Sequence, residues 1–211
     1  MIDYNNFYYI FPPRPKNAID PKHLNTWDDS SMICQPKTNG SNAVIFLNGT
    51  SCYIYNRHGG RLTNVEINDQ EILNLYSGKG WMVLNGEYLN KSKKDENNQS
   101  FNHKLIIFDI LVYNSEYLVG ETFQNRIELL DRLFDRKNSE KDYLFGVSQN
   151  VYRVKSYLSN FKELFDKWTK VDLLEGVVLK RKNARLEIGT TESNNTNSQI
   201  KSRKKSKSYK F

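Results

Sequence analysis

Two short β-forming runs, residues 43–47 and 52–55, flank the dipeptide Asn48-Gly49. An Asn-Gly pair between two such runs is the strongest short-range signal for a β-hairpin, because both residues tolerate positive φ. The connection is either the two-residue turn itself or a longer one that extends through Thr50-Ser51. In both cases the pattern predicts antiparallel pairing in this part of the fold.

Other apolar runs predict the rest of the sheet framework. Residues 105–112 are almost entirely apolar and predict a fully buried central strand. Asp109 interrupts this run, and a carboxylate inside a buried strand needs a partner. Further strands are predicted at 81–89, at 143–154 with a polar interruption, and around Ile200, where a strand would carry the basic side chains of the C-terminal stretch.

Two segments carry apolar side chains at helical spacing. Within residues 121–134 these are Phe123, Ile127, Leu130, Leu133 and Phe134, and within 158–168 they are Leu158, Phe161, Leu164, Phe165 and Trp168. Such stripes predict helices that pack one face against a core. For both segments, packing against a core is the ordinary explanation.

Length and charge limit the domain organisation and the partners. A chain of 211 residues forms one domain, or one large domain with a small appendage, and its 38% hydrophobic content is enough for a core. The 31 Lys and Arg against 24 Asp and Glu give a net charge of +7, which favours a polyanionic partner such as nucleic acid or nucleotide phosphates. We expect residues 1–34 to form an extended N-terminal segment that wraps the domain surface, and residues 35–211 to form the domain. The low-complexity stretch 190–198 is expected to be a mobile loop.

Several classes of protein are disfavoured. Cys34 and Cys52 stand in no metal or redox spacing, and three scattered histidines support neither a zinc site nor a histidine-based triad. No apolar N-terminal signal segment is present, and no run approaches the roughly 18 apolar residues of a membrane span. We therefore expect an intracellular, cytoplasmic protein with reduced cysteines and no membrane partner.

Lys37 is the candidate nucleophile. Pro36 fixes its own backbone and holds Gln35 extended, while Asn39-Gly40 forms a turn pair, so the lysine is confined at a sharp entry into a sheet. A lysine attacks phosphorus or carbon only as the neutral amine, which requires partial desolvation or neighbouring cations. On the octapeptide alone, a solvated turn lysine is the more common explanation.

Other unusual residues follow in order. Arg57 ends the second hairpin strand, Glu87 is a single carboxylate in an apolar run, Glu175 opens a short apolar strand, and Lys201 and Arg203 lie in the C-terminal basic stretch. Each has an ordinary explanation as a surface or core residue, and it is the joint pattern that is informative. Their order and spacing over residues 35–203 resemble the covalent nucleotidyltransferase superfamily, which includes the ATP-dependent DNA and RNA ligases and the mRNA capping guanylyltransferases.

The resemblance assigns roles residue by residue. The first family motif, lysine–any–aspartate–glycine, falls on residues 37–40, which makes Lys37 the residue that forms a lysyl–AMP phosphoramidate. Asn39 stands where aspartate is usual. Asn42 occupies a position that is arginine in many DNA ligases and asparagine in one class of phage RNA ligases. Glu175 matches the carboxylate that helps to hold a divalent metal.

The remaining matches concern the nucleotide. The resemblance implies that Arg57 reaches the nucleotide or the nick phosphate, that Glu87 contacts the ribose, and that Phe108 stacks on the purine. Lys180 ends the motif that Glu175 opens and is expected close to phosphate. Lys201 and Arg203 match the pair that binds the α-phosphate, although lysine is more common at the second position. The expected cofactor-binding set is Gln35, Asn42, Arg57, Glu87, Phe108, Lys180, Lys201 and Arg203.

The resemblance implies an α+β fold of antiparallel sheets with flanking helices around a nucleotide cleft, the ATP-grasp-like nucleotidyltransferase domain of ligases. The activity implied is that of a polynucleotide ligase, with ATP and Mg²⁺ or Mn²⁺ as cofactors and nicked duplex nucleic acid as partner. DNA is preferred over RNA, because the Pro-Pro-Arg-Pro opening and the basic C-terminal stretch look like those of small phage or viral DNA ligases. A guanylyltransferase that forms lysyl–GMP is an alternative, as is a basic nucleic-acid-binding module without turnover. No OB-fold domain follows the last motif in this sequence, so we expect that surface to be missing or supplied by another chain.

Overall fold

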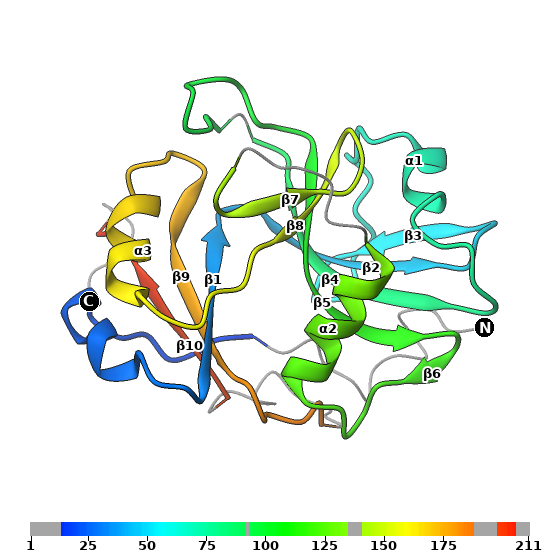
Figure 1. The fold of residues 1–211 in the computed structure, drawn as a ribbon. Helices are drawn as coiled ribbons and strands as arrows, with labels where there is room; N and C mark the ends of the chain where they lie inside the picture. Colours follow the sequence, from blue (N-terminus) through cyan, green and yellow to red (C-terminus); the bar gives the residue numbers. More distant parts are fainter. Residues whose placement is uncertain (1–13, 92, 135–140, 188–197, 206–211) are drawn as a thin grey trace.

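The computed structural model describes residues 14–91, 93–134, 141–187 and 198–205, which form two β-sheets with helices packed against them (Figure 1). The larger sheet has the strand order β3-β2-β4-β5-β8-β7, with β6 paired to β5, and the smaller has the order β1-β9-β10. The strands of the larger sheet are β2 (Ser41–Leu47), β3 (Cys52–Tyr55), β4 (Met82–Leu89), β5 (Lys104–Tyr113), β6 (Glu116–Tyr117), β7 (Leu144–Gly146) and β8 (Val151–Val154).

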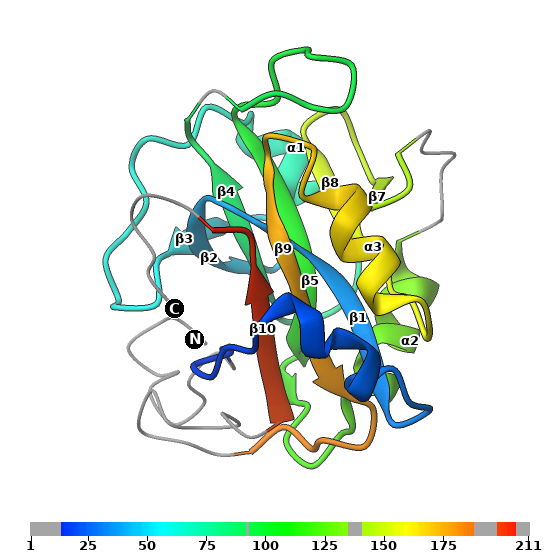
Figure 2. The same cartoon turned by 90° about the vertical axis from the view of Figure 1, so that its left-hand side faces the viewer.

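The smaller sheet consists of β1 (Met32–Thr38), β9 (Leu174–Arg181) and β10 (Gln199–Arg203), which lie side by side in Figure 2. The helices are the 3-10 helix η2 (Pro21–Trp27) and the α-helices α1 (Asp69–Leu73), α2 (Phe123–Leu133) and α3 (Phe161–Trp168). All pairings in both sheets are antiparallel except β5 with β8, which is parallel. The predicted α+β class with antiparallel sheets and flanking helices is therefore confirmed.

Helices α3 and η2 cover the smaller sheet. Leu24 of η2, Trp168 of α3 and Leu179 of β9 are fully buried in one apolar cluster. A second cluster joins β2, β4 and β5 to α1 and α2. No helix among the described residues is long and apolar enough to cross a membrane.

The hairpin and the central strand are confirmed. Strands β2 and β3 pair from Val44 with Tyr55 to Leu47 with Cys52, and the connection takes the longer of the two expected forms, closed by a hydrogen bond from Asn48 N to Ser51 O. The Asn48 side chain accepts hydrogen bonds from the backbone of the next turn residues, which explains the preference for asparagine there. Strand β5 lies between β4 and β8, as expected for a buried run.

Three expectations differ from the structure. Residues 143–154 form two antiparallel strands, β7 and β8, because the polar interruption is the turn between them. Leu158 lies before α3 and is 58% exposed, since the helix begins at Phe161. Helix α2 begins two residues later than expected because Thr122 caps it through its side chain.

The N-terminal segment also differs from its expected surface position. The described residues up to 34 include η2 and the first half of β1, and Leu24, Met32 and Cys34 are buried. The reason is that α3 and β9 leave an apolar face that these side chains cover. The division into a segment 1–34 and a domain 35–211 stays a prediction, and β1 runs across that boundary. Of the loop expected at 190–198, residues 190–197 lie outside the described residues.

Candidate active site

Strand β9 sets the arrangement of the site, because it pairs on both edges. Gly176 lies opposite Lys37 of β1 and Arg203 of β10, and Val178 lies opposite Gln35 and Lys201. Side chains two residues apart on a strand share a face. The register therefore brings Gln35 and Lys37 of β1 and the two cations of β10 to neighbouring positions on the two sides of β9.

Gly176 is required for this close approach. A Cβ atom at this position would lie 2.0 Å from the carbonyl oxygen of Ser202, and the backbone has a φ of +156°. Both the contact and the backbone angle exclude other residues without a shift of β10. The glycine that follows Glu175 thus sets the spacing between β9 and β10, the strand that carries Lys201 and Arg203.

These strands and the larger sheet enclose a cavity of about 480 Å³. Nine of the ten residues predicted for the site line it, and the tenth, Glu175, reaches it through Lys37. The lining residues are Arg14, Pro15, Lys16, Gln35, Pro36, Lys37, Thr38, Asn42, Arg57, Glu87, Phe108, Val178, Lys180, Gln199, Lys201 and Arg203. Arg57 enters from the loop after β3, as its place at a strand end predicted.

Lys37 forms an ion pair inside this cavity. Its Nζ atom lies 2.6 Å from Oε2 of Glu175, and it also donates to the carbonyl oxygen of Thr38 at 3.3 Å. The side chains of Lys37 and Glu175 are 19% and 11% exposed. The amine is therefore partly desolvated and in contact with a group that can accept its proton.

Glu87 fixes the loop that follows Lys37. Its carboxylate accepts hydrogen bonds from the backbone N–H of Gly40 at 2.6 Å and from the hydroxyl of Thr38 at 3.0 Å. A Cβ atom on Gly40 would come within 2.5 Å of the Tyr88 carbonyl oxygen, so glycine is required here too. Burial raises the pKa of Glu87, partly offset by Lys37 and the two hydrogen bonds. In this structure Glu87 supports the first motif.

Lys180 lies at the aromatic side of the cavity. Its Nζ atom is 4.9 Å from the centre of the Phe108 ring and 4.5 Å from that of Phe123. Burial lowers the pKa of Lys180 to about 8, opposed by the nearby Asp109 and assisted by Arg126. Such contacts between a cation and ring faces stabilise a desolvated lysine.

Asn42 and Gln35 present buried polar atoms at the cavity. Asn42 donates to the side-chain oxygen of Asn85 and to the carbonyl oxygen of Gly86, and Gln35 donates to the Ser156 hydroxyl. Among the described residues, the side-chain oxygens of Gln35 and Asn42 are buried without a hydrogen-bond partner. Unsatisfied buried acceptors are costly, and a ligand with N–H or O–H donors would satisfy them.

The cations of the cavity lie close enough to influence one another. Burial lowers the pKa of Lys201, and the neighbouring charges of Arg203, Lys37, Arg14 and Arg57 lower it further. Seven lining residues are basic (Arg14, Lys16, Lys37, Arg57, Lys180, Lys201 and Arg203), whereas Glu87 is the single acidic one. Such a site attracts a polyanion of the size of a nucleotide.

The set of predicted site residues omitted seven lining residues, Arg14, Pro15, Lys16, Pro36, Thr38, Val178 and Gln199. Arg14 and Lys16 belong to the proline-rich opening, whose extended composition predicts only a surface course. Alternating basic residues near prolines are a signal that could have drawn attention to them, but their position depends on contacts with β10, almost 190 residues later in the sequence.

A divalent metal fits the carboxylates of this cavity in one way. The described residues contain no group of three or more His, Cys, Asp or Glu that could hold a metal ion. Mg²⁺ is nevertheless usually bound through one or two carboxylates together with the phosphates of a substrate. Glu175, at the amine of Lys37, is placed to be such a ligand once a nucleotide is bound.

A family model described as "ATP dependent DNA ligase domain" matches residues 16–196. The chain belongs to this family. The fold agrees, because a mycobacterial DNA ligase D complexed with ATP superimposes with a TM-score of 0.66 at 15% identity, over 93% of this chain and 61% of the other. The ligase domain of LigD from M. tuberculosis gives a TM-score of 0.64 at 15% identity, over 93% of this chain and 60% of the other.

A third solved structure, of a Lig E DNA ligase described as binding DNA with a minimal scaffold, gives a TM-score of 0.54 at 16% identity, over 90% of this chain and 68% of the other. Comparison with curated proteins finds no match. This ligase-family chain spans about 60% of the length of the two ligase D structures above.

Proposed function

We propose that this chain is the adenylyltransferase domain of an ATP-dependent polynucleotide ligase and that Lys37 becomes adenylated. The observation that carries the proposal is the position of the Lys37 amine, half-buried beside Glu175 in a cavity that also contains Phe108 and the cations of β10. Membership of the ligase-domain family supports ATP as the nucleotide.

Different residues of the cavity would bind different parts of the nucleotide. Phe108 offers an aromatic face for the purine, and the orphaned oxygens of Gln35 and Asn42 accept from donors of the nucleotide. Lys201, Arg203 and Arg57 neutralise the negative charge that develops on the phosphoryl oxygens in the transition state. Glu87 holds the loop of residues 38–40 through its two hydrogen bonds, and it lines the cavity in which the ribose would bind.

In the first step the neutral amine of Lys37 attacks the α-phosphorus. The N–P bond forms, the bond from the α-phosphorus to the oxygen that bridges to the β-phosphate breaks, and pyrophosphate leaves with that oxygen. Glu175 Oε2, 2.6 Å from Nζ, accepts the proton that the amine must lose. The Lys37–Glu175 ion pair has to separate before the attack, because a protonated amine has no free electron pair. A bound Mg²⁺, held by Glu175 and the phosphates, would add charge neutralisation.

In the later steps AMP passes from Lys37 to the 5′-phosphate of a nick, and the 3′-OH then displaces AMP to join the strands. DNA is our preferred substrate, because the family model and the similar structures are those of DNA ligases. RNA is the second candidate substrate, because position 42 is asparagine here, whereas many DNA ligases have arginine at the matching position. The Asn42 side chain donates hydrogen bonds to Asn85 and Gly86.

The deciding experiment measures the intact mass of the protein after incubation with Mg²⁺ and either ATP or GTP. We expect a gain of one AMP from ATP, its absence in Lys37→Ala, and its retention in the matched control Lys22→Ala, whose lysine is exposed and outside the cavity. A gain of GMP from GTP would instead assign a capping guanylyltransferase. No adduct on a folded protein would leave a nucleic-acid-binding module.

The substrate is then tested with the adenylated protein on nicked duplexes that carry a DNA or an RNA 3′-OH strand. Preferential transfer of AMP to the all-DNA nick is expected. Transfer only to nicks with an RNA 3′-OH strand would contradict the DNA preference and leave the adenylation chemistry intact.

A further inference from the structure

The N-terminal residues 14–19 run along the outer edge of β10 and are attached to its two-cation stretch. Lys201 N donates to Asn17 O at 3.0 Å, Ile19 N donates to Lys201 O at 2.9 Å, and the hydroxyl of Ser202 donates to Ile19 O at 3.1 Å. The side chain of Lys201 also donates to Pro15 O at 3.0 Å. The segment is thus fixed to β10, the strand that carries Lys201 and Arg203.

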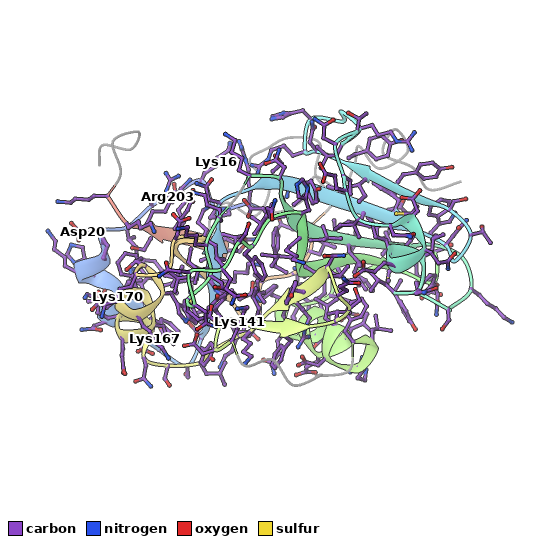
Figure 3. All side chains as sticks on the ribbon, turned by 90° about the horizontal axis from the view of Figure 1, so that it is seen from above. Lys16, Asp20, Lys141, Lys167, Lys170 and Arg203 are labelled. Carbon is purple, nitrogen blue, oxygen red and sulfur yellow. The ribbon has the colours of Figure 1, made fainter. Side chains whose placement is uncertain are left out.

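This attachment places two further basic side chains at the cavity. Arg14 and Lys16 both line it, and Pro15 between them makes the contact with Lys201. Arg14 is half-buried, whereas Lys16 is exposed. Figure 3 shows Lys16 and Arg203 on the same side of the molecule, near β10. Arg14 lies near enough to Lys201 to perturb its titration.

The proposed first ligation step requires positive charge at the β- and γ-phosphates as well as at the α-phosphate. Lys37 forms the new bond. Arg203 lies on the other side of Gly176 from Lys37, and Lys201 lies two residues earlier on β10. Pyrophosphate leaves with several negative charges, which must be neutralised where it departs. Arg14 and Lys16 stand on the N-terminal side of the same cavity, beyond Lys201, and have no role in the adenylation step as described above.

We propose that Arg14 and Lys16 bind the β- and γ-phosphates of ATP and the departing pyrophosphate. The inference rests on the proposed adenylation of Lys37, whose leaving group these cations would neutralise. A guanidinium can donate two parallel hydrogen bonds to a phosphate, and Lys16 at the exposed mouth adds a point charge where the leaving group exits. The proline-rich segment therefore contributes directly to ATP use.

The test uses Arg14→Gln and Lys16→Gln, singly and together, with Lys22→Gln as the matched control, because Lys22 loses the same charge from the same N-terminal region outside the cavity. In the double variant we expect the KM for ATP in self-adenylation to rise at least tenfold. The pyrophosphate concentration that half-maximally discharges preformed lysyl-AMP should rise by a similar factor. The affinity for AMP, which lacks both phosphates, should change less than twofold, and Arg14→Lys should recover part of the loss.

Several outcomes would overturn the inference. An equal loss of AMP affinity would mean that the segment only shapes the cavity. Unchanged ATP and pyrophosphate dependence with weaker binding of a nicked duplex would assign the two cations to nucleic acid. If the wild-type protein forms no adduct, the proposed function fails, and calorimetric titration of wild type and double variant with pyrophosphate alone still decides whether these cations bind it.

Discussion

Two ion pairs in this molecule differ in how deeply they are buried and in how many of their polar atoms have partners within the protein. Arg126 bonds Asp109 through two nitrogens, at 2.8 and 3.0 Å, and both side chains are at most 3% exposed. The remaining capacity of this pair is used by the Glu121 carbonyl and the Ile110 N–H. Lys37 and Glu175, in contrast, share a single 2.6 Å contact and face a cavity of about 480 Å³.

The comparison indicates which pair can be exchanged for a ligand. The Asp109 pair is closed, because each guanidinium nitrogen of Arg126 and each carboxylate oxygen of Asp109 has a hydrogen-bond partner within the protein. The Lys37 pair is open on one side, where other cations and space for a nucleotide lie. The first therefore holds α2 against β5, and the second is available for reaction. The predictions below are ordered by their expected effect on the free energy of unfolding.

The largest effect is expected from Asp109→Ala, which leaves Arg126 as an uncompensated buried charge. Breaking such a pair by removal of one partner costs about 3–5 kcal/mol. Denaturant unfolding measures this loss. As control, Asp166→Ala removes the partner of Lys162 in an exposed pair and should change stability by less than about 0.5 kcal/mol. A loss under 1 kcal/mol for Asp109→Ala would mean that the closed pair does not hold the fold.

Gly176→Ala should cost about 3 kcal/mol and also abolish adduct formation, because the new Cβ would push β10 away from β9. Thermal unfolding and intact mass measure the two effects. Gly146→Ala is the matched control, since a Cβ there meets nothing within 4 Å. Full adduct formation by Gly176→Ala would show that the close approach of these strands is unnecessary.

Lys180 predicts a pH dependence of stability. Burial lowers its pKa to about 8, from 10.5, so between these values the unfolded chain binds a proton that the native protein has released. The free energy of unfolding therefore rises with pH across this range, by about 3 kcal/mol, relative to Lys180→Met. Unfolding curves at pH 7.5 and 10.5 measure the difference, and the exposed Lys79→Met variant should behave as wild type. A parallel pH dependence in wild type and Lys180→Met would contradict it.

The smallest effect on stability is expected from Glu175→Gln, about 1 kcal/mol or less, because the amide keeps the shape of the carboxylate and the pair is partly solvated. Its rate of adduct formation should nevertheless fall at least tenfold, measured by intact mass over time. This variant tests the comparison directly: breaking an open pair should change the free energy of unfolding little and the rate of adduct formation strongly. Loss of stability comparable to that of Asp109→Ala would erase the distinction.

The features that local sequence determines were predictable. The hairpin at Asn48 follows from its turn residues, and the buried run of β5, with an aspartate that needs a partner, follows from composition. The predicted cavity residues were chosen from motif order, and the pairing of β1, β9 and β10 brings most of them to one cavity.

The predictions that differ from the structure concern features that depend on distant contacts. The turn between β7 and β8 is held by Glu71 of α1, which accepts hydrogen bonds from Ser148 and Asn150. Nothing in residues 143–154 alone reveals that partner. The course of the N-terminal segment depends in the same way on β10 and on the apolar face of α3, so its composition suggested a surface wrap while Leu24 and Cys34 became core.

The place of β10 in the chain has a consequence for synthesis. Translation proceeds from the N-terminus, so Lys37, Phe108 and Glu175 emerge before the stretch 199–203. Until that last strand docks between β9 and residues 17–19, the nascent chain has Lys37 and Phe108 but not Lys201 and Arg203 at the cavity. On the proposed function, reaction with ATP is thereby tied to completion of the smaller sheet, because a chain interrupted before residue 199 lacks both cations.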